Sequence, residues 1–241
     1  MNETTTIAEP IGPTLAGMAL GARMAAPFAP GLIVFALANG ALSAQTGLSF
    51  AETFGMSGVM FAGGAQAMAT QMWPHGAWSL STTLTMIGVV AAVNSRMFLM
   101  GASLRPWLSQ APASLIYPNL ALLTDLNWSI GVSHRANGGS DIGVVLGAGL
   151  LSWIVWTPIC MLGWALTGLV TDPRRYALDL MMVVVFSAMS INVFKRARSA
   201  SPFVVSGAAA LAASWLIGGF WFIVIGAVAG AGWAALRGGD A

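Results

Sequence analysis

Residues 93–104 read Val-Asn-Ser-Arg-Met-Phe-Leu-Met-Gly-Ala-Ser-Leu, which sets an amide and a guanidinium inside an otherwise apolar run. An ionisable side chain within a hydrophobic segment is costly to desolvate, so it usually faces a protein interior or a water-filled cavity. A long arginine side chain has an alternative, because its head group can snorkel to the nearer membrane interface. The orientation of Arg96, and of Asn94 beside it, is therefore the central question that this sequence raises.

The apolar surroundings of this stretch extend along most of the chain. Only 7% of the 241 residues are charged and 57% are hydrophobic, and the mean hydropathy is +0.78, all typical of an integral membrane protein. Five windows carry no Asp, Glu, Lys or Arg: 24–51, 53–95, 142–170, 180–194 and 199–236. They are continuously apolar, whereas barrel strands alternate in polarity. We predict an all-α, polytopic helix bundle with about 7–8 transmembrane helices, since each crossing needs about 20 apolar residues.

The windows also predict the organisation of the chain. Residues 1–23 form an amino-terminal extension, an interfacial or re-entrant lead-in that ends at Arg23; residues 24–237 form one transmembrane domain, and 238–241 a cytoplasmic tail. With eight crossings, Arg135 and most other cations share a face with the amino terminus, and Arg105 lies on the opposite face. Positive charge favours the cytoplasmic side, so both termini are predicted inside. The expected spans are 24–45, 50–73, 78–104, 115–132, 142–170, 180–194 and a hairpin over 202–236.

The second expected span contains the glycine pair Gly63-Gly64, with Gln66 close behind. Paired glycines permit an unwound turn at membrane depth, and they equally permit close helix packing. A broken, re-entrant segment here would reduce the crossings to seven. Three Gly-x-x-x-Gly pairs are further candidate packing faces, for internal helices or, less favoured, for a partner subunit: 17–21, 143–147 and 226–230.

Depth counting gives Arg96 a prospective partner. If spans 78–104 and 115–132 are antiparallel neighbours, Arg96 and Asp125 lie roughly 12 and 15 Å from their shared end, at about 1.5 Å per residue. An aspartate at that depth stays ionised only with a cation or hydrogen-bond donors nearby. We therefore expect Arg96 and Asp125 to meet, with snorkelling of Arg96 and a broken fourth span as the alternatives.

Other chemistries have little support in the sequence. Gly55-Met56-Ser57-Gly58 resembles the setting of an intramembrane serine protease, but that reaction needs a histidine in a facing span, and neither histidine is well placed for it. No histidine and carboxylate cluster has metal-ligand spacing, so no cofactor is expected. The net charge of +2 does not predict nucleic-acid binding. The single cysteine, Cys160, excludes an internal disulfide.

Four motifs in order resemble the AzlC-type permease family, the large subunits of two-component branched-chain amino-acid exporters. They are Phe61-Ala-Gly-Gly-Ala-Gln66, Asn94-Ser-Arg96 followed by Leu104 and Pro106, Leu122-Leu-Thr-Asp125, and Asp172-Pro173 followed by Leu178-Asp179. The resemblance extends over about residues 24–236. The chain departs from the family pattern at Leu126, where an acidic residue is usual, and at Met97, often a polar position. These departures leave the substrate and any proton coupling open.

The resemblance implies a secondary transporter that exports branched-chain or similar aliphatic amino acids across the bacterial inner membrane, together with a small AzlD-type membrane subunit. A zwitterion needs donors for its carboxylate, acceptors for its ammonium and an apolar pocket. From this chemistry we predict a substrate-binding set: Gly63, Gly64, Gln66, Asn94, Arg96, Thr124 and Asp125. The competing interpretation is a non-transport structural or assembly component, in which these polar residues only hold helices together.

Overall fold

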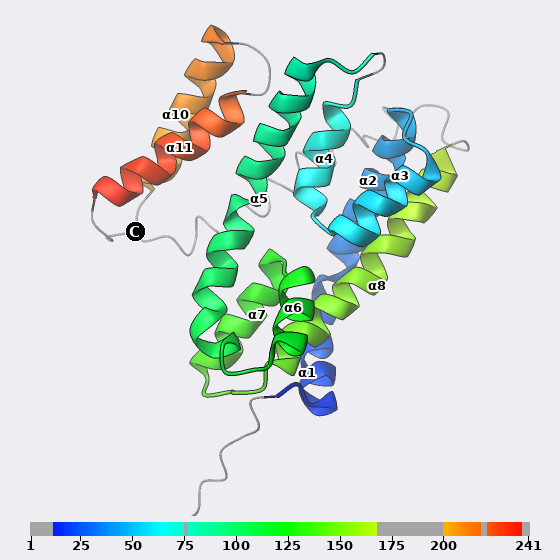
Figure 1. Ribbon diagram of the computed structural model, residues 1–241, viewed down its shortest axis with the longest axis vertical. Coiled ribbons are helices and arrows are strands. Elements are labelled where there is room, and N and C mark those ends of the chain that lie inside the picture. Colours follow the sequence, from blue (N-terminus) through cyan, green and yellow to red (C-terminus); the bar gives the residue numbers. More distant parts are fainter. Residues whose placement is uncertain (1–11, 75–76, 168–199, 218–220, 238–241) are drawn as a thin grey trace, which may run out of the picture.

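The computed structural model describes residues 12–74, 77–167, 200–217 and 221–237. Every regular element in these ranges is a helix (Figure 1), which confirms the all-α prediction. Three helices are long and apolar enough to cross a membrane: Leu15–Gln45, Leu80–Leu108 and Gly143–Leu166. The predicted count of spans is not confirmed, because two expected spans are broken and the expected span 180–194 lies outside the described residues.

The first long helix begins earlier than the sequence predicts. Thr14 caps it by accepting a hydrogen bond from the Gly17 N–H (2.9 Å). The expected end of the lead-in at Arg23 falls inside this helix, because Pro27 and Pro30 occupy opening positions where proline does not interrupt helical hydrogen bonding. Its three parts are α1 (Leu15–Ala25), the 3-10 turn η1 (Ala26–Phe28) and α2 (Ala29–Gln45).

Glycines bring this helix into backbone contact with α8 (Gly143–Leu166). A Cβ on Gly21 would overlap the Val144 carbonyl, and one on Gly147 would overlap the Met18 carbonyl. Further along the same seam, Cβ atoms on Gly40 and Gly163 would collide with the Cys160 and Leu37 carbonyls. Two of the three predicted Gly-x-x-x-Gly pairs therefore pack against each other within the chain, as small residues at membrane helix contacts do.

The two ends of helix α8 define the two ends of the bundle, and positions along α8 give the depth of the segments that contact it. At its start, Asp141 accepts hydrogen bonds from the Thr14 hydroxyl and from the Thr14 N–H (3.2 Å), next to the beginning of α1. Near its end, Trp164 Nε1 donates to the Leu48 carbonyl (2.8 Å), just after α2. We call these the Asp141 end and the Trp164 end of the bundle.

The second expected span does not cross but enters from the Trp164 end and returns to it. The Phe50 ring packs on the Trp164 ring at 5.5 Å, whereas Trp153 Nε1, about three turns earlier on α8, donates to the Gly58 carbonyl (2.8 Å). The returning piece has nine residues, about 13 Å of helix, too short for a crossing. The pieces are α3 (Phe50–Phe54), the π-helical turn η2 (Gly55–Met60) and α4 (Gly63–Gln71).

The break between η2 and α4 lies at Phe61 and Ala62, which we call the first break. Phe61 has φ 44°, a left-handed conformation that is strained for a bulky side chain. Gly63 then opens α4, and a Cβ there would lie 2.7 Å from the Trp156 ring. Both interpretations of the glycine pair thus hold, because the helix is broken beside it and Gly63 also packs closely.

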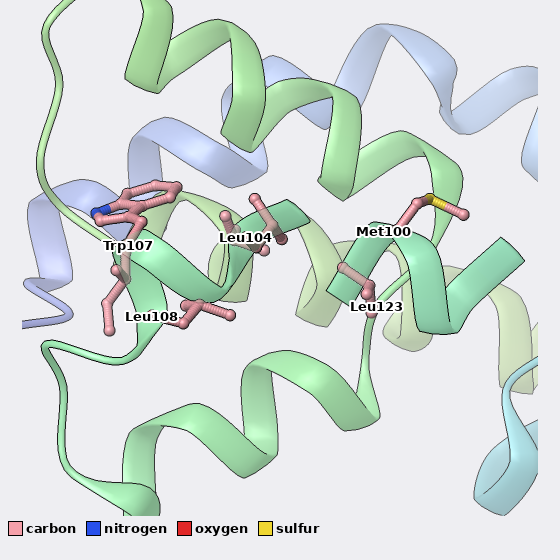
Figure 2. Packing of buried hydrophobic residues seen from close by; sticks show 7 residues of the cluster. Met100, Leu104, Trp107, Leu108 and Leu123 are labelled. Atoms are coloured by element: carbon pink, nitrogen blue, oxygen red, sulfur yellow. The ribbon is translucent and has the colours of Figure 1, made fainter. Parts of the chain in front are cut away.

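Helix α5 (Leu80–Leu108) crosses in the opposite direction to α8 and ends at the Asp141 end. There Trp107 Nε1 donates to the Ser140 carbonyl (2.9 Å). Met100, Leu104 and Trp107 pack in one buried cluster with Leu123 from the next segment (Figure 2). This cluster fixes the depth of the carboxyl-terminal half of α5 relative to α8.

The fourth expected span is wrong as a single crossing. The chain turns at Leu122–Thr124, the second break, so that α6 (Ala113–Ala121) runs inward and α7 (Asp125–Ala136) runs back to the Asp141 end. The chain turns here because of a capping box, in which the Thr124 and Asn127 side chains each accept a hydrogen bond from the other residue's backbone N–H group. In Figure 1, α6 and α7 lie at the same end of the bundle as α1, opposite to α3 and α4, and α7 contacts α1.

This second re-entrant pair also corrects the predicted distribution of charge. Since α5 ends where α7 ends, Arg105 and Arg135 lie at the same end of the bundle and not on opposite faces. Arg135 lines a shallow surface groove between α5 and α7, together with Trp107 and Val132. Two of the described cations, Arg105 and Arg135, therefore lie at the Asp141 end.

The expected carboxyl-terminal hairpin is confirmed. Helices α10 (Ser201–Leu216) and α11 (Trp221–Leu236) pack side by side and α11 contacts α5. The third Gly-x-x-x-Gly pair forms their seam, because Cβ atoms on Gly226 and Gly230 would lie 2.9 Å from the Ala210 Cβ and 2.8 Å from the Ser206 Cβ.

Candidate functional site

The predicted partnership of Arg96 and Asp125 is present. Arg96 Nη1 lies 3.0 Å from Asp125 Oδ1 and 3.0 Å from Oδ2, so one nitrogen serves both carboxylate oxygens. The side chains are 38% and 37% exposed. An ion pair this open contributes little to stability, about 0–1 kcal/mol. The pair is therefore better suited to exchanging partners than to holding helices together.

Asp125 reaches this position because it begins α7 at the second break. Its backbone lies in the first helical turn, where the helix dipole stabilises a carboxylate. Thr124 precedes it as the cap residue, and its hydroxyl faces Asn127 and not the ion pair. The structure thus gives Thr124, predicted as a substrate ligand, a local role in ending one helix and starting the next.

Asn127 is the residue that the sequence prediction missed. It is completely buried, and its Oδ1 accepts from the Thr124 N–H (2.6 Å) and hydroxyl (3.1 Å). Its Nδ2 donates to the Leu122 carbonyl (2.8 Å) and to the Val145 carbonyl of α8 (3.4 Å). One amide therefore satisfies both sides of the second break and anchors it to α8. The detectable signal was its position three residues after a threonine, the spacing of a capping box.

The surroundings of Arg96 contain unpaired polar atoms. Arg96 Nε and Asn94 Oδ1 are buried and have no hydrogen-bond partner in the described residues. Asn94 precedes Arg96 by two positions, about 200° around the helix, so the two side chains leave α5 on different faces. A buried polar atom without a partner costs about 1–3 kcal/mol. Such a cost is tolerated most readily where a ligand supplies the missing bond.

A second group of predicted residues surrounds the first break. Gln66 is 1% exposed, and its Nε2 donates to the Ser57 hydroxyl (2.8 Å) on η2. Asn39 of α2, outside the predicted set, is 0% exposed and donates from Nδ2 to the Gly63 carbonyl (3.2 Å). Gly64 is buried behind Gly63. Neutral hydrogen bonds thus tie both sides of this break together.

Six of the seven predicted residues therefore fall into two groups, and Asn94, whose Oδ1 has no partner in the described residues, joins neither. Arg96, Asp125 and Thr124 meet at the second break, whereas Gly63, Gly64 and Gln66 meet at the first, and no hydrogen bond or ion pair links the groups within the described part of the chain. Both groups lie against α8, the first near Trp156 and the second near Gly149, where a Cβ would lie 2.7 Å from Asn127 Nδ2.

The geometry gives no support to the protease interpretation. Ser57 is fully buried and its hydroxyl bonds to Gln66. His134 packs beside the Trp107 ring at the Asp141 end, with ring centroids 6.3 Å apart. Within the residues that the structure describes, no three His, Cys, Asp or Glu side chains are grouped to hold a metal ion.

Residues 27–170 match the sequence model of the AzlC protein family. The chain belongs to the AzlC family. The matched stretch contains both breaks and the ion pair, while the Asp172-Pro173 loop lies beyond it. AzlC proteins form a transporter family with an amino-acid permease role, which agrees with the apolar helices of a membrane protein. No curated protein and no solved structure matches the chain significantly.

Proposed function

We propose that this AzlC protein is a secondary transporter that exports branched-chain or similar aliphatic amino acids across the bacterial inner membrane, together with a small AzlD-type membrane subunit. The observation that carries the proposal is the half-exposed Arg96–Asp125 pair at a helix break. Family membership supports the general transport role.

The ion pair offers a chemically matched exchange. An amino acid presents a carboxylate and an ammonium, so Arg96 can take the former and Asp125 the latter without either charge being left alone. The start of α7 adds the positive end of its helix dipole for the carboxylate. A substrate then replaces one internal ion pair with two external ones, which keeps the electrostatic cost of binding and release low.

The charge distribution supports an orientation in which the Asp141 end faces the cytoplasm. Arg105 and Arg135 lie near that end, and cytoplasmic loops are enriched in such cations. The start of α1 lies at the same end, so the amino terminus is proposed to be cytoplasmic. The predicted cytoplasmic carboxyl terminus depends on residues outside the described ranges and stays a prediction.

Efflux of labelled leucine from bacterial cells tests the proposal. We expect efflux when the chain is expressed with its small membrane partner, little efflux from either protein alone, and a large loss in Arg96→Gln and Asp125→Asn. Arg105→Gln, a change at an exposed arginine of the same helix, is the matched control and should export like the parent. Unchanged export by the first two variants, at normal membrane levels, would contradict the proposal.

A further inference from the structure

Two buried amides at the first break keep an oxygen atom without a partner. Asn39 and Gln66 are 0% and 1% exposed, and Asn39 Oδ1 and Gln66 Oε1 form no hydrogen bond within the described residues. Trp156 Nε1 is a third unpartnered atom nearby, but it is a donor. The two oxygens are the acceptors that the fold leaves unused at this position.

The hydrogen bonds of the two amide NH₂ groups explain why the amide oxygens have no partner. The Asn39 NH₂ group donates to the Gly63 carbonyl at the start of α4, and the Gln66 NH₂ group donates to the Ser57 hydroxyl on η2. Reversing the Asn39 amide would place its oxygen against another carbonyl oxygen. Gln66 therefore bridges the two sides of the break, and Asn39 bonds α2 to its α4 side, so each amide NH₂ group is occupied and each oxygen is not.

The surrounding chemistry favours a positively charged occupant. The carboxyl end of η2 directs the negative end of its backbone dipoles toward the break. The Ser57 hydroxyl retains acceptor capacity after its bond to Gln66. No Asp, Glu, Lys or Arg occurs in the windows 24–51, 53–95 and 142–170 that surround the break. Glu52, between the first two windows, is exposed and bonded to Ser49 at the start of α3, and Arg96 is the next charge on α5. A set of neutral oxygens suits a singly charged cation, whereas a divalent ion usually requires carboxylates.

We infer that the first break is a binding site for a desolvated monovalent cation, held by Asn39 Oδ1, Gln66 Oε1 and the Ser57 hydroxyl. The charge has two possible sources, a free Na⁺ ion or the ammonium group of an amino acid. The ammonium source rests on the proposed function, and the Na⁺ source does not. The break thereby becomes a second, neutral site, separate from the charged one at Arg96 and Asp125.

Thermal unfolding of the purified chain in detergent, together with its partner subunit where that is needed for stability, tests this inference. One arm replaces choline chloride with NaCl at constant ionic strength and no amino acid present. The other arm adds leucine in choline chloride. Each arm uses the parent and three variants: Gln66→Leu, Gln66→Glu and the control Asn119→Leu.

The control is closely matched. Asn119 is also 0% exposed, its Nδ2 donates to the Leu115 carbonyl (2.9 Å) and its Oδ1 is unpartnered, but it lies on α6. Gln66→Glu keeps a bond to Ser57, because the hydroxyl can donate to the new carboxylate. The added charge should lower the half-saturating Na⁺ concentration by about tenfold.

Each outcome of the unfolding experiment supports or overturns the cation site. A rise in unfolding temperature with NaCl that is lost in Gln66→Leu, strengthened in Gln66→Glu and kept in Asn119→Leu supports a free cation. The same pattern with leucine alone supports the ammonium group. No response of the parent in either arm, or an equal response in all variants, overturns the site. Failure of leucine efflux with an intact Na⁺ response would contradict the proposed function but not this inference.

Discussion

The two helix breaks have the same architecture and opposite chemistry. Each lies between two short helices that enter the bundle from one end and return to it, the first from the Trp164 end and the second from the Asp141 end. The first break is sealed and neutral, with Gln66 at 1% exposure; the second is open and charged, with Asp125 at 37%. The first break is therefore a buried polar junction, whereas the second presents an accessible ion pair.

The comparison also shows two ways to hold broken backbone at membrane depth. At the second break, the Asn127 amide uses all of its hydrogen-bonding capacity on the break and on α8. At the first, donors from α8 and α2 each bond to one carbonyl, Gly58 and Gly63, while two amide oxygens stay unpaired. Irregular backbone is tolerated at this depth only where protein or water supplies such bonds.

Reversing the charge at the second break should have the largest effect. Asp125→Arg places two guanidinium groups together with no carboxylate between them, so we expect leucine efflux to be lost. The double variant Arg96→Asp with Asp125→Arg restores opposite charges and should recover the protein level in the membrane, measured by immunoblot. Equal membrane levels for the single and double variants would show that the charges at these two positions do not affect the stability of the protein.

Loss of the Asn127 amide is expected to rank next. Asn127→Ala leaves the Leu122 carbonyl and the Thr124 N–H without their partner, so the free energy of unfolding should fall by about 2–4 kcal/mol. The measurement is thermal unfolding in detergent. Asn137→Ala, which removes an exposed amide bonded to the Ser133 carbonyl, serves as the control. A similar loss in both variants would show that the second break does not depend on this residue.

A methyl group at the first break should have an intermediate effect. Gly63→Ala directs its Cβ at the Trp156 ring, and overpacking of this kind costs about 1–3 kcal/mol. Gly55→Ala is the matched change, since its Cβ would meet nothing within 4 Å, and it should leave stability unchanged or slightly higher. If Gly63→Ala unfolded at the parent temperature, the first break would be loosely packed.

The smallest effect is expected for the cap at the second break. Thr124→Ala removes the hydroxyl that caps α7 and should cost about 1 kcal/mol, whereas Thr124→Ser keeps the hydroxyl and should cost little. The difference in unfolding temperature between the two variants measures the cap alone. A marked fall in leucine efflux with Thr124→Ser would instead indicate that the threonine methyl contacts the substrate.

Much of the fold and part of the site were predictable from local composition. Long apolar windows predicted helices because backbone in a membrane must satisfy its hydrogen bonds internally. Depth counting predicted that Arg96 and Asp125 meet, and it succeeded even though the fourth span is broken, because both residues were counted from the same connecting loop. The count of crossings fails, since the first broken pair returns the chain to the Trp164 end and thereby places Arg105 at the same end as the start of α1. The second broken pair then keeps Arg135 at that end.

The sequence by itself determined that this AzlC protein is a helical membrane protein, that charge is concentrated at a few depths, and which small residues form helix seams. These properties depend on hydrophobicity and spacing along the chain, which need no knowledge of neighbours. Only the tertiary structure decided that two segments turn back midway, and that Asn39 and Asn127 stabilise the turns. Crossing or turning depends on whether a distant helix supplies hydrogen bonds to the exposed backbone, and here α8 and α2 supply them.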